Sequence, residues 1–277
     1  MNYLVPLNFS IKEIIEKCIS NYRDADLKNR FTDSISFIEN ETKIYLEKSK
    51  KNKLDEINEH EEVNSISKKE MVKLYDVKFV QGKIPRSKYY DKILSNTKSG
   101  LCPYCNQIIA DTLDHFLQKS KYPTFSISPI NLVPSCSSCN KTKENTKITG
   151  HHLHPYFDNV ENIKWLKAEI YDFEDIKFRF HVDPLLELDH ILIQKIENHI
   201  GIFNLVNTFG IYAKVELNNN KYHYQTTFNT SGRLGLKNTI DSQYKTYLTY
   251  NKNSWQTALF GCLRDSNWFL DHGVHLI

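Results

Sequence analysis

One stretch decides the fold, residues 102–143: CPYCNQIIADTLDHFLQKSKYPTFSISPINLVPSCSSCNKTK. It contains two Cys-x-x-Cys pairs, Cys102 with Cys105 at its start and Cys136 with Cys139 near its end. Four thiolates can surround one structural zinc ion as a tetrahedron, and a two-residue spacing lets each pair form a tight turn with both sulfurs directed at it. Thirty residues separate the pairs, more than in the commonest zinc ribbons. We therefore expect further structure inside the loop.

Composition and length agree with a cytoplasmic metal-binding protein. The chain has 277 residues, 40% of them hydrophobic, which is enough for one large domain or two smaller ones. No run of about 18 apolar residues is present, and the N-terminus lacks the features of a signal peptide. Without a secretory signal, six cysteines favour metal binding over disulfide pairing. The net charge of +3 permits binding to a polyanion without proving it.

Periodicity predicts an α+β fold that is predominantly helical, in three regions. Residues 1–99 carry helical patterns, with Ser10 capping the first helix and Cys18 on its apolar face. Residues 100–157 form the metal-binding module. Residues 158–277 begin with alternating polar and apolar residues over 168–182, a hairpin pattern, and then return to helical periodicity with Cys262 on an apolar face. The module is therefore expected between helical N- and C-terminal regions.

Polar residues inside the module suit phosphodiester hydrolysis. This reaction needs a base that activates water and a cation that stabilises charge on the phosphate. His115 titrates near neutral pH and is a suitable base. Asp114 and the amide oxygen of Asn140 are hard ligands suited to Mg²⁺. Neighbouring residues on a strand face opposite ways, so we expect a bend at the strand end to present Asp114 and His115 to one cleft.

At these residues the chain resembles the HNH endonuclease family, whose ββα-metal fold is a variant of the treble clef. The resemblance is carried by the two cysteine pairs and by four segments, which are Leu113-Asp-His-Phe-Leu117, Lys119-Ser-Lys-Tyr-Pro123, Asn131-Leu-Val-Pro-Ser-Cys136 and Cys139-Asn-Lys-Thr-Lys143. It covers roughly a fifth of the chain with specific motifs.

The resemblance implies a role for each residue. His115 would be the general base, Asp114 and Asn140 the ligands of a catalytic Mg²⁺ or Mn²⁺ ion, and Asn131 the residue that orients the loop carrying the base. His115, Asn131 and Asn140 at the three motif positions make this an H-N-N variant. Lys143 matches a basic position of the family that contacts phosphate. Cys102, Cys105, Cys136 and Cys139 would hold the structural zinc ion.

The expected function is metal-dependent cleavage of DNA. The flanks, including His154-Pro-Tyr-Phe-Asp158, resemble those of bacterial stand-alone HNH proteins, some of them anti-phage effectors. That resemblance implies an ATPase or other regulatory subunit as a partner. The lack of a long apolar run predicts that the protein has no membrane partner. The alternative is a non-catalytic, zinc-stabilised module that binds nucleic acid or protein. His151, His152 and His154 are expected to have packing or surface roles, with a second metal site as the other interpretation.

Overall fold

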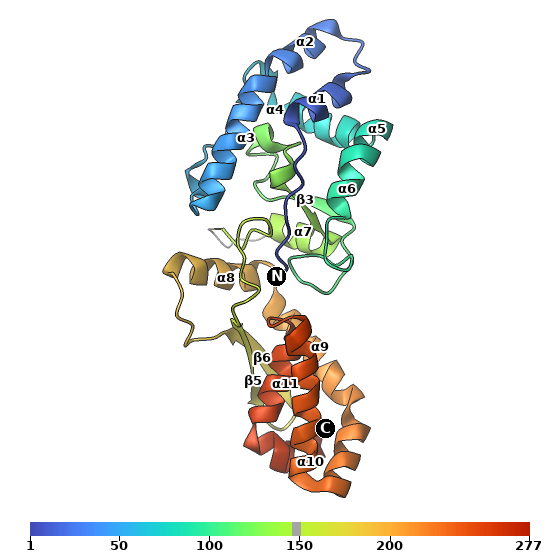
Figure 1. Ribbon diagram of the computed structural model, residues 1–277, viewed down its shortest axis with the longest axis vertical. Coiled ribbons are helices and arrows are strands. Elements are labelled where there is room, and N and C mark those ends of the chain that lie inside the picture. The colour runs from blue at the N-terminus through green and yellow to red at the C-terminus, as the bar shows by residue number, and fades with distance from the viewer. Residues whose placement is uncertain (146–150) are drawn as a thin grey trace. The chain divides into compact units, whose positions relative to one another are not determined.

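The computed structural model describes residues 1–145 and 151–277 (Figure 1). They form two compact units, Asn2–Asn159 and Val160–Ile277, the second including Met1. Helices predominate in the described residues, and the sheets there are two-stranded. This confirms the predicted α+β, predominantly helical class. Apart from Met1, the helical region predicted for residues 1–99 lies in the same unit as the module predicted for 100–157, and the boundary between the units follows residue 159.

Helices build the first part of the unit Asn2–Asn159. They are α1 (Ile11–Ile19), α2 (Ala25–Asp33), α3 (Ile35–Lys50), η1 (Leu54–Glu56), α4 (Lys68–Lys73), η2 (Leu74–Phe79), α5 (Lys83–Pro85), η3 (Arg86–Tyr90) and α6 (Asp91–Leu94), with a short hairpin of β1 (Glu62–Val63) and β2 (Ile66–Ser67). Ser10 caps α1 as predicted, because its hydroxyl accepts the Glu13 N–H at 3.3 Å. The apolar periodicity also predicts one long helix from about residue 26 to 50, but the structure divides it at Ser34, whose hydroxyl donates to the Arg30 carbonyl at 2.8 Å.

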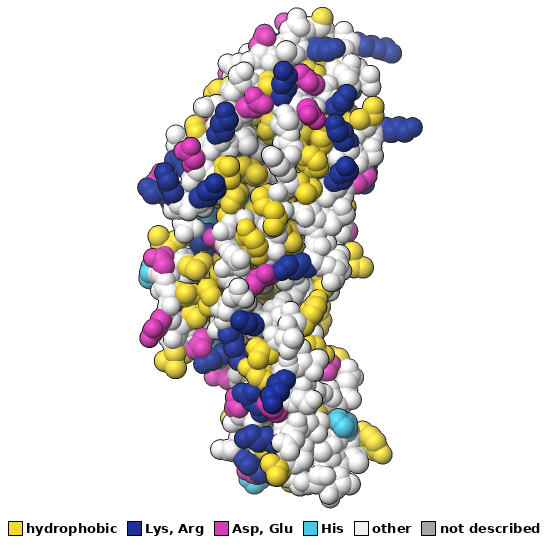
Figure 2. Space-filling model, in the orientation of Figure 1, with side chains coloured by type: hydrophobic (Ala, Val, Ile, Leu, Met, Phe, Trp, Pro, Cys, Tyr) yellow, Lys and Arg dark blue, Asp and Glu magenta, His cyan; other side chains and the backbone are white. Residues whose placement is uncertain are grey.

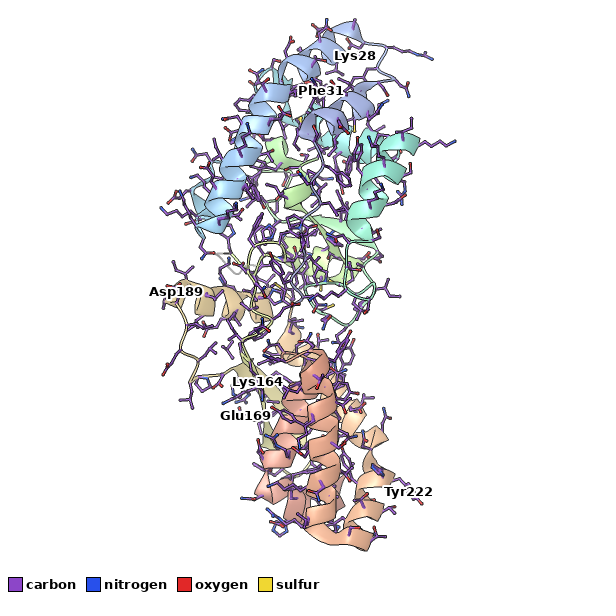
Figure 3. All side chains as sticks on the ribbon, in the orientation of Figure 1. Lys28, Phe31, Lys164, Glu169, Asp189 and Tyr222 are labelled. Carbon is purple, nitrogen blue, oxygen red and sulfur yellow. The ribbon has the colours of Figure 1, made fainter. Side chains whose placement is uncertain are left out.

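The core of this unit joins the N-terminal helices to the module. Ile14 and Cys18 of α1 and Phe31 of α2 are buried in one cluster, together with Leu113 and Leu132 from the segment between the cysteine pairs. Figure 3 labels Phe31 on the ribbon of α2. Burying such side chains contributes about 1.5–3 kcal/mol each. The helices therefore hold the strands that carry the candidate site.

Between the cysteine pairs the chain forms two strands, followed by a helix. Strand β3 (Thr112–His115) pairs antiparallel with β4 (Leu132–Ser135), so that His115 lies opposite Leu132. Two 3-10 turns, η4 (Pro123–Phe125) and η5 (Pro129–Asn131), lie in the loop between them. The sequence predicts a helix over residues 140–145, with Asn140 at its start. Helix α7 (Ser137–Glu144) begins three residues earlier, because Cys136 acts as its N-cap.

The unit Val160–Ile277 has its own hairpin and helices. Strands β5 (Leu166–Asp172) and β6 (Lys177–Val182) form the predicted antiparallel hairpin. The helices are α8 (His190–Ile202), α9 (Leu205–Asn219), α10 (Lys221–Tyr250), α11 (Trp255–Asp265), η6 (Phe269–Gly273) and α12 (Val274–Leu276). Helix α11 packs against β5, and α9 packs against β6.

Helix α10 reverses direction at Gly232. This residue has φ 64° and ψ −167°, a conformation that essentially only glycine adopts. On either side of it the chain folds back on itself, since the Tyr224 hydroxyl donates to Gln243 Oε1 at 2.6 Å and the Gln243 amide donates to Asn220 at 3.0 Å. Near the start of α10, Tyr222 projects into solvent (Figure 3). Residues 220–250 are therefore a helical hairpin.

Candidate functional site

Four cysteines form a compact, buried cluster. All pairs of sulfur atoms among Cys102, Cys105, Cys136 and Cys139 lie within 4.8 Å of one another, and Cys105 Sγ and Cys136 Sγ are 4.0 Å apart. Zn–S bonds of about 2.3 Å in a tetrahedron place the sulfurs about 3.8 Å apart. The predicted ligands are thus brought together as predicted, and the cluster can hold one zinc ion.

Backbone geometry directs each pair toward the cluster. After Cys105 the chain turns at Asn106, which has φ 57°, and the Asn106 N–H donates to the Cys102 carbonyl at 2.8 Å. Cys136 caps α7, and its sulfur accepts the Cys139 N–H at 3.4 Å. One pair therefore comes from a tight turn and the other from the start of a helix.

The four thiols are electrostatically coupled. Hydrogen bonding with Cys102 and the other thiols holds the pKa of Cys105 below its usual range and raises the pKa of Cys139 above it. Buried thiolates repel one another, so all four can be deprotonated together only when a cation lies between them. The electrostatics of the cluster agree with its geometry.

Beside this cluster lies a cavity of about 640 Å³. Its wall contains Asp114 and His115 at the end of β3 and Asn140 of α7, three of the predicted site residues. The other charged residues in the wall are Asp76, Lys119 and Glu144. A volume of this size accommodates a small-molecule-sized portion of a substrate.

His115 is held as a neutral base. Its Nε2 lies 2.9 Å from the Ser126 carbonyl oxygen, and because a carbonyl only accepts, Nε2 carries the hydrogen and Nδ1 is the basic nitrogen. Burial lowers the pKa of His115 to about 4, against the hydrogen bond to Ser126, and the positive charge of Lys119 lowers it further. The ring of Tyr75 packs edge-on against His115 with centroids 4.4 Å apart. At neutral pH the imidazole can accept a proton.

Asp114 is buried and already bound to a lysine. The Lys143 ammonium donates to both carboxylate oxygens, at 2.8 and 2.6 Å, and to the His115 carbonyl at 2.5 Å. Tyr104, inside the first cysteine pair, donates its hydroxyl to Asp114 Oδ2 at 2.8 Å. Since each carboxylate oxygen offers about two acceptor sites, Oδ1 retains one for a further cation. Lys143 lies under Asp114, buried, and the described cavity wall does not include it.

Asn131 binds the backbone of the loop that follows His115. It does not line the cavity. Its side chain is fully buried, accepts the Leu117 N–H at 2.8 Å and donates to the Leu117 and Phe125 carbonyls at 3.0 and 3.2 Å. Leu117 is two residues beyond His115, and Phe125 precedes the Ser126 that binds the imidazole. Asn131 is therefore a positioning residue.

Lys119 and Tyr104 are site residues to which the sequence assigned no role. Lys119 Nζ lies 4.7 Å from the centre of the Tyr75 ring and donates to Asp76 at 2.5 Å. Its side chain retains 31% exposure in the cavity wall, so it can reach an anion there. The only sequence signals were the position of Lys119 four residues after His115 and that of Tyr104 between two cysteines.

His151, His152 and His154, which follow helix α7 in the chain, pack around Phe116. The ring centroids of His152 and His154 lie 4.6 and 3.9 Å from that of Phe116, and that of His151 lies 6.0 Å away. Among residues 1–145 and 151–277, one group of three or more Cys, His, Asp or Glu side chains lies close enough together to share a metal ion. That group is the four cysteines, and it includes none of these histidines. This favours the packing role expected for these histidines.

On the face shown in Figure 2, Lys and Arg side chains are interspersed with Asp and Glu and do not form a single large basic patch. Among the described residues, no helix combines the length and the apolar character needed to cross a bilayer.

Comparison with known proteins gives one sequence relative. The chain is 25% identical over 228 residues to protein ea31 of Escherichia phage lambda, an alignment that spans 75% of each protein. No protein-family model matches the chain. No solved structure matches it significantly.

Proposed function

We propose that this chain is a metal-dependent endonuclease of the HNH class that hydrolyses phosphodiester bonds in DNA. The observation that carries the proposal is the convergence of His115, Asp114 and Asn140 on one cavity, with Asn140 directly following Cys139 of the four-cysteine cluster. The order of a cysteine turn, strand β3, strand β4 and helix α7 supports assignment of this segment to the ββα-metal, treble-clef-like fold.

The proton transfer is assigned to His115. Nδ1 of the neutral ring takes a proton from water, the water oxygen bonds to phosphorus, and the bond from phosphorus to the leaving 3′ oxygen breaks. The hydrogen bond from Nε2 to Ser126 fixes the ring orientation and stabilises the imidazolium that forms. General-base catalysis of this kind contributes about 10²–10⁴-fold to the rate.

Asp114 and Asn140 suit a hard divalent ion. A bound Mg²⁺ or Mn²⁺ ion would stabilise negative charge on the phosphate and the leaving oxygen. The donors are a carboxylate and an amide oxygen, which such ions prefer. Tyr104 and Lys143 orient the Asp114 carboxylate through their hydrogen bonds. We further assign Lys119 to the phosphate, because it is the lysine in the described cavity wall.

The test is cleavage of supercoiled plasmid with Mg²⁺, with EDTA, and with Mn²⁺ added back. Wild-type protein should cut with either ion and stop with EDTA, and Asn140→Ala should require more Mg²⁺. His115→Gln should lower kcat by about 10²–10⁴-fold while zinc content and DNA affinity stay unchanged. Glutamine is the sharp substitution because its amide can still donate to the Ser126 carbonyl but cannot accept the proton. Near wild-type cleavage by His115→Gln would remove the general base from the mechanism.

One observation favours the non-catalytic alternative, a zinc-stabilised module that binds nucleic acid or protein. The Asp114 carboxylate is already neutralised by Lys143 at 2.6 Å, which a purely structural ion pair would also explain. Under that alternative the wild-type protein binds DNA or a partner without cutting under any metal condition.

A role in anti-phage defence is a separate proposal, which rests on the sequence resemblance of the flanks. It includes an ATPase or other regulatory subunit that licenses cutting. Phage plaque counts on cells that express wild-type protein or His115→Gln test it, with equal counts excluding the role.

A further inference from the structure

Three buried polar side chains from distant parts of the sequence meet behind the candidate site. They are Tyr45 of α3, Asn131 before β4, and His154, each no more than 1% exposed. The Tyr45 hydroxyl lies 3.2 Å from Asn131 Oδ1 and 3.1 Å from His154 Nε2. We call these three residues the Asn131 network.

The direction of each hydrogen bond in the network follows from its neighbours. The Tyr156 N–H points at His154 Nδ1 at 3.1 Å, so Nδ1 accepts and Nε2 carries the hydrogen. Nε2 then donates to the Tyr45 oxygen, and the Tyr45 hydroxyl donates to Asn131 Oδ1. Burial raises the pKa of Tyr45 well above its usual range, so the hydroxyl keeps its proton.

The network fixes which way the Asn131 amide faces. Oδ1 accepts from Tyr45 and from the Leu117 N–H, whereas Nδ2 donates to the carbonyls of Leu117 and Phe125. A flipped amide would place its NH₂ group against the Leu117 N–H and its oxygen against two carbonyls. Because the Tyr45 oxygen accepts the hydrogen of His154 Nε2, the Tyr45 hydroxyl is left to donate its own hydrogen to Asn131 Oδ1. This favours the amide orientation in which Asn131 binds both Leu117 and Phe125.

That loop follows the proposed base and carries its hydrogen-bond acceptor. Leu117 lies two residues after His115, and Phe125 adjoins Ser126, whose carbonyl accepts from the imidazole. An error in the position of either end would move Nδ1 relative to the cavity. Displacements of about 1 Å can cost about 10²-fold in rate.

We propose that Tyr45 and His154 are positioning residues for His115, acting through Asn131. The inference rests on the proposed nuclease function for its effect on catalysis, but the positioning itself can be measured without cleavage. It also implies that the segment 100–157 is not a complete catalytic module, because Tyr45 comes from α3.

The first experiment measures steady-state DNA cleavage by Tyr45→Phe, which removes only the hydroxyl. We expect kcat to fall about tenfold with KM for DNA and zinc content unchanged. His154→Leu should lose a similar amount, and the double variant should lose no more than either single one. His154→Gln should recover activity, since its amide can replace Nε2–H as the donor.

Tyr224→Phe is the matched control. Tyr224 is equally buried, and its hydroxyl also donates to a side-chain amide oxygen, that of Gln243 at 2.6 Å, in the other unit. It should leave kcat unchanged. Losses in Tyr45→Phe and His154→Leu that simply multiply, or an equal loss in Tyr224→Phe, would overturn the proposal.

A second experiment separates positioning from function by hydrogen exchange of the Leu117 amide. Tyr45→Phe and His154→Leu should speed its exchange, while the Ala110 amide, bound to the Gly100 carbonyl at 2.9 Å, stays unchanged. Faster exchange in a protein that cuts no DNA would reject the nuclease and retain the positioning. Unchanged Leu117 exchange in both variants would overturn the positioning, whatever the wild-type protein cleaves. Should Tyr45→Phe fail to fold, the comparison of His154→Gln with His154→Leu gives the same decision.

Discussion

Asn131 and Asn253 play the same structural role in the two units, because each is buried and hydrogen-bonds to the backbone of a loop. Only the loop held by Asn131 carries part of a candidate site. Asn253 is buried in the unit Val160–Ile277 and accepts the N–H groups of Trp165 and Leu166 at 2.8 and 3.1 Å, while donating to the Ile163 carbonyl at 2.6 Å. Asn131 holds its loop in the same way. A buried asparagine therefore indicates a fixed loop, and the chemistry depends on what that loop carries.

The two loops differ in what adjoins them. The segment that Asn131 holds belongs to the same unit as Asp114, His115 and the four cysteines. These polar side chains can surround a cation. The Asn253 loop instead leads into β5, which packs against α11, and the buried Leu166 and Leu259 on these two elements are apolar.

Loss of zinc should have the largest effect. Purified protein should contain about one zinc per chain, and Cys139→Ser or strong chelation should unfold the β3–β4 hairpin, because structural zinc contributes about 10 kcal/mol or more. Hydrogen exchange should rise at the Cys102 and Asp111 amides, while β5–β6, which carries no zinc ligand, changes less. A zinc-free module with unchanged protection, or a Cys105–Cys136 disulfide, would contradict this.

The paired variants Asn131→Ala and Asn253→Ala test whether the two buried asparagines differ in function. Each leaves backbone groups buried without partners, so each should lower the free energy of unfolding of its own unit by about 2–4 kcal/mol. Only Asn131→Ala should also lower kcat at a temperature where both variants are folded. Denaturation followed by cleavage assays measures both, and an equal kcat loss in Asn253→Ala would show that the activity reports stability alone.

The sequence predicted the parts of this site that are local. The four cysteines, the strand ending at His115 and the β5–β6 hairpin are each encoded by spacing or alternation within a few residues. The convergence of Asp114, His115 and Asn140 on one cavity followed from the motif. The resemblance placed Lys143 at the phosphate, whereas in the fold it faces inward and binds Asp114.

Long-range partners could not be predicted. Tyr45 is 86 residues from Asn131 and 109 from His154, and nothing in either neighbourhood marks it as polar and buried in advance. The reversal at Gly232 was missed for a related reason. A single glycine within a polar helical pattern does not by itself predict a reversal, and the turn becomes evident from the backbone angles of Gly232 and from the long-range hydrogen bond between Tyr224 and Gln243.

Gly232→Ala should destabilise the unit Val160–Ile277 by about 1–3 kcal/mol, because an L-residue is strained at φ 64° and ψ −167°. No atom lies within 4 Å of the added Cβ, so the cost is backbone strain rather than a clash. Ser231→Ala, one residue earlier on an exposed helical position, is the control and should be near neutral. Thermal unfolding measures both, and equal melting temperatures for the two variants would place the reversal elsewhere.

Removing one ion pair from each unit should change the free energy of unfolding least. Arg30 binds Glu70 through two hydrogen bonds of 2.7 and 3.0 Å, and Glu70 also closes the capping box of α4. The Arg30 hydrogen bonds lower the pKa of Glu70 from 4.5 to about 2. The counterpart, Arg233–Asp271 at 2.7 Å, has both side chains 42% exposed and should contribute almost nothing.

Because the Glu70 pKa is depressed in the folded state, its contribution is fully present above pH 4.5 and is lost as the pH falls toward 2. Solvent screening of this partly exposed pair reduces the effect to about 1 kcal/mol. Urea denaturation should thus show Glu70→Gln less stable than wild type by a constant amount between pH 7 and 5, with the difference shrinking below pH 4.5. Asp271→Asn should show no difference at any pH. A Glu70→Gln difference that persists unchanged at pH 3 would assign the loss to the capping box, because a neutral glutamine then fails for a reason other than charge.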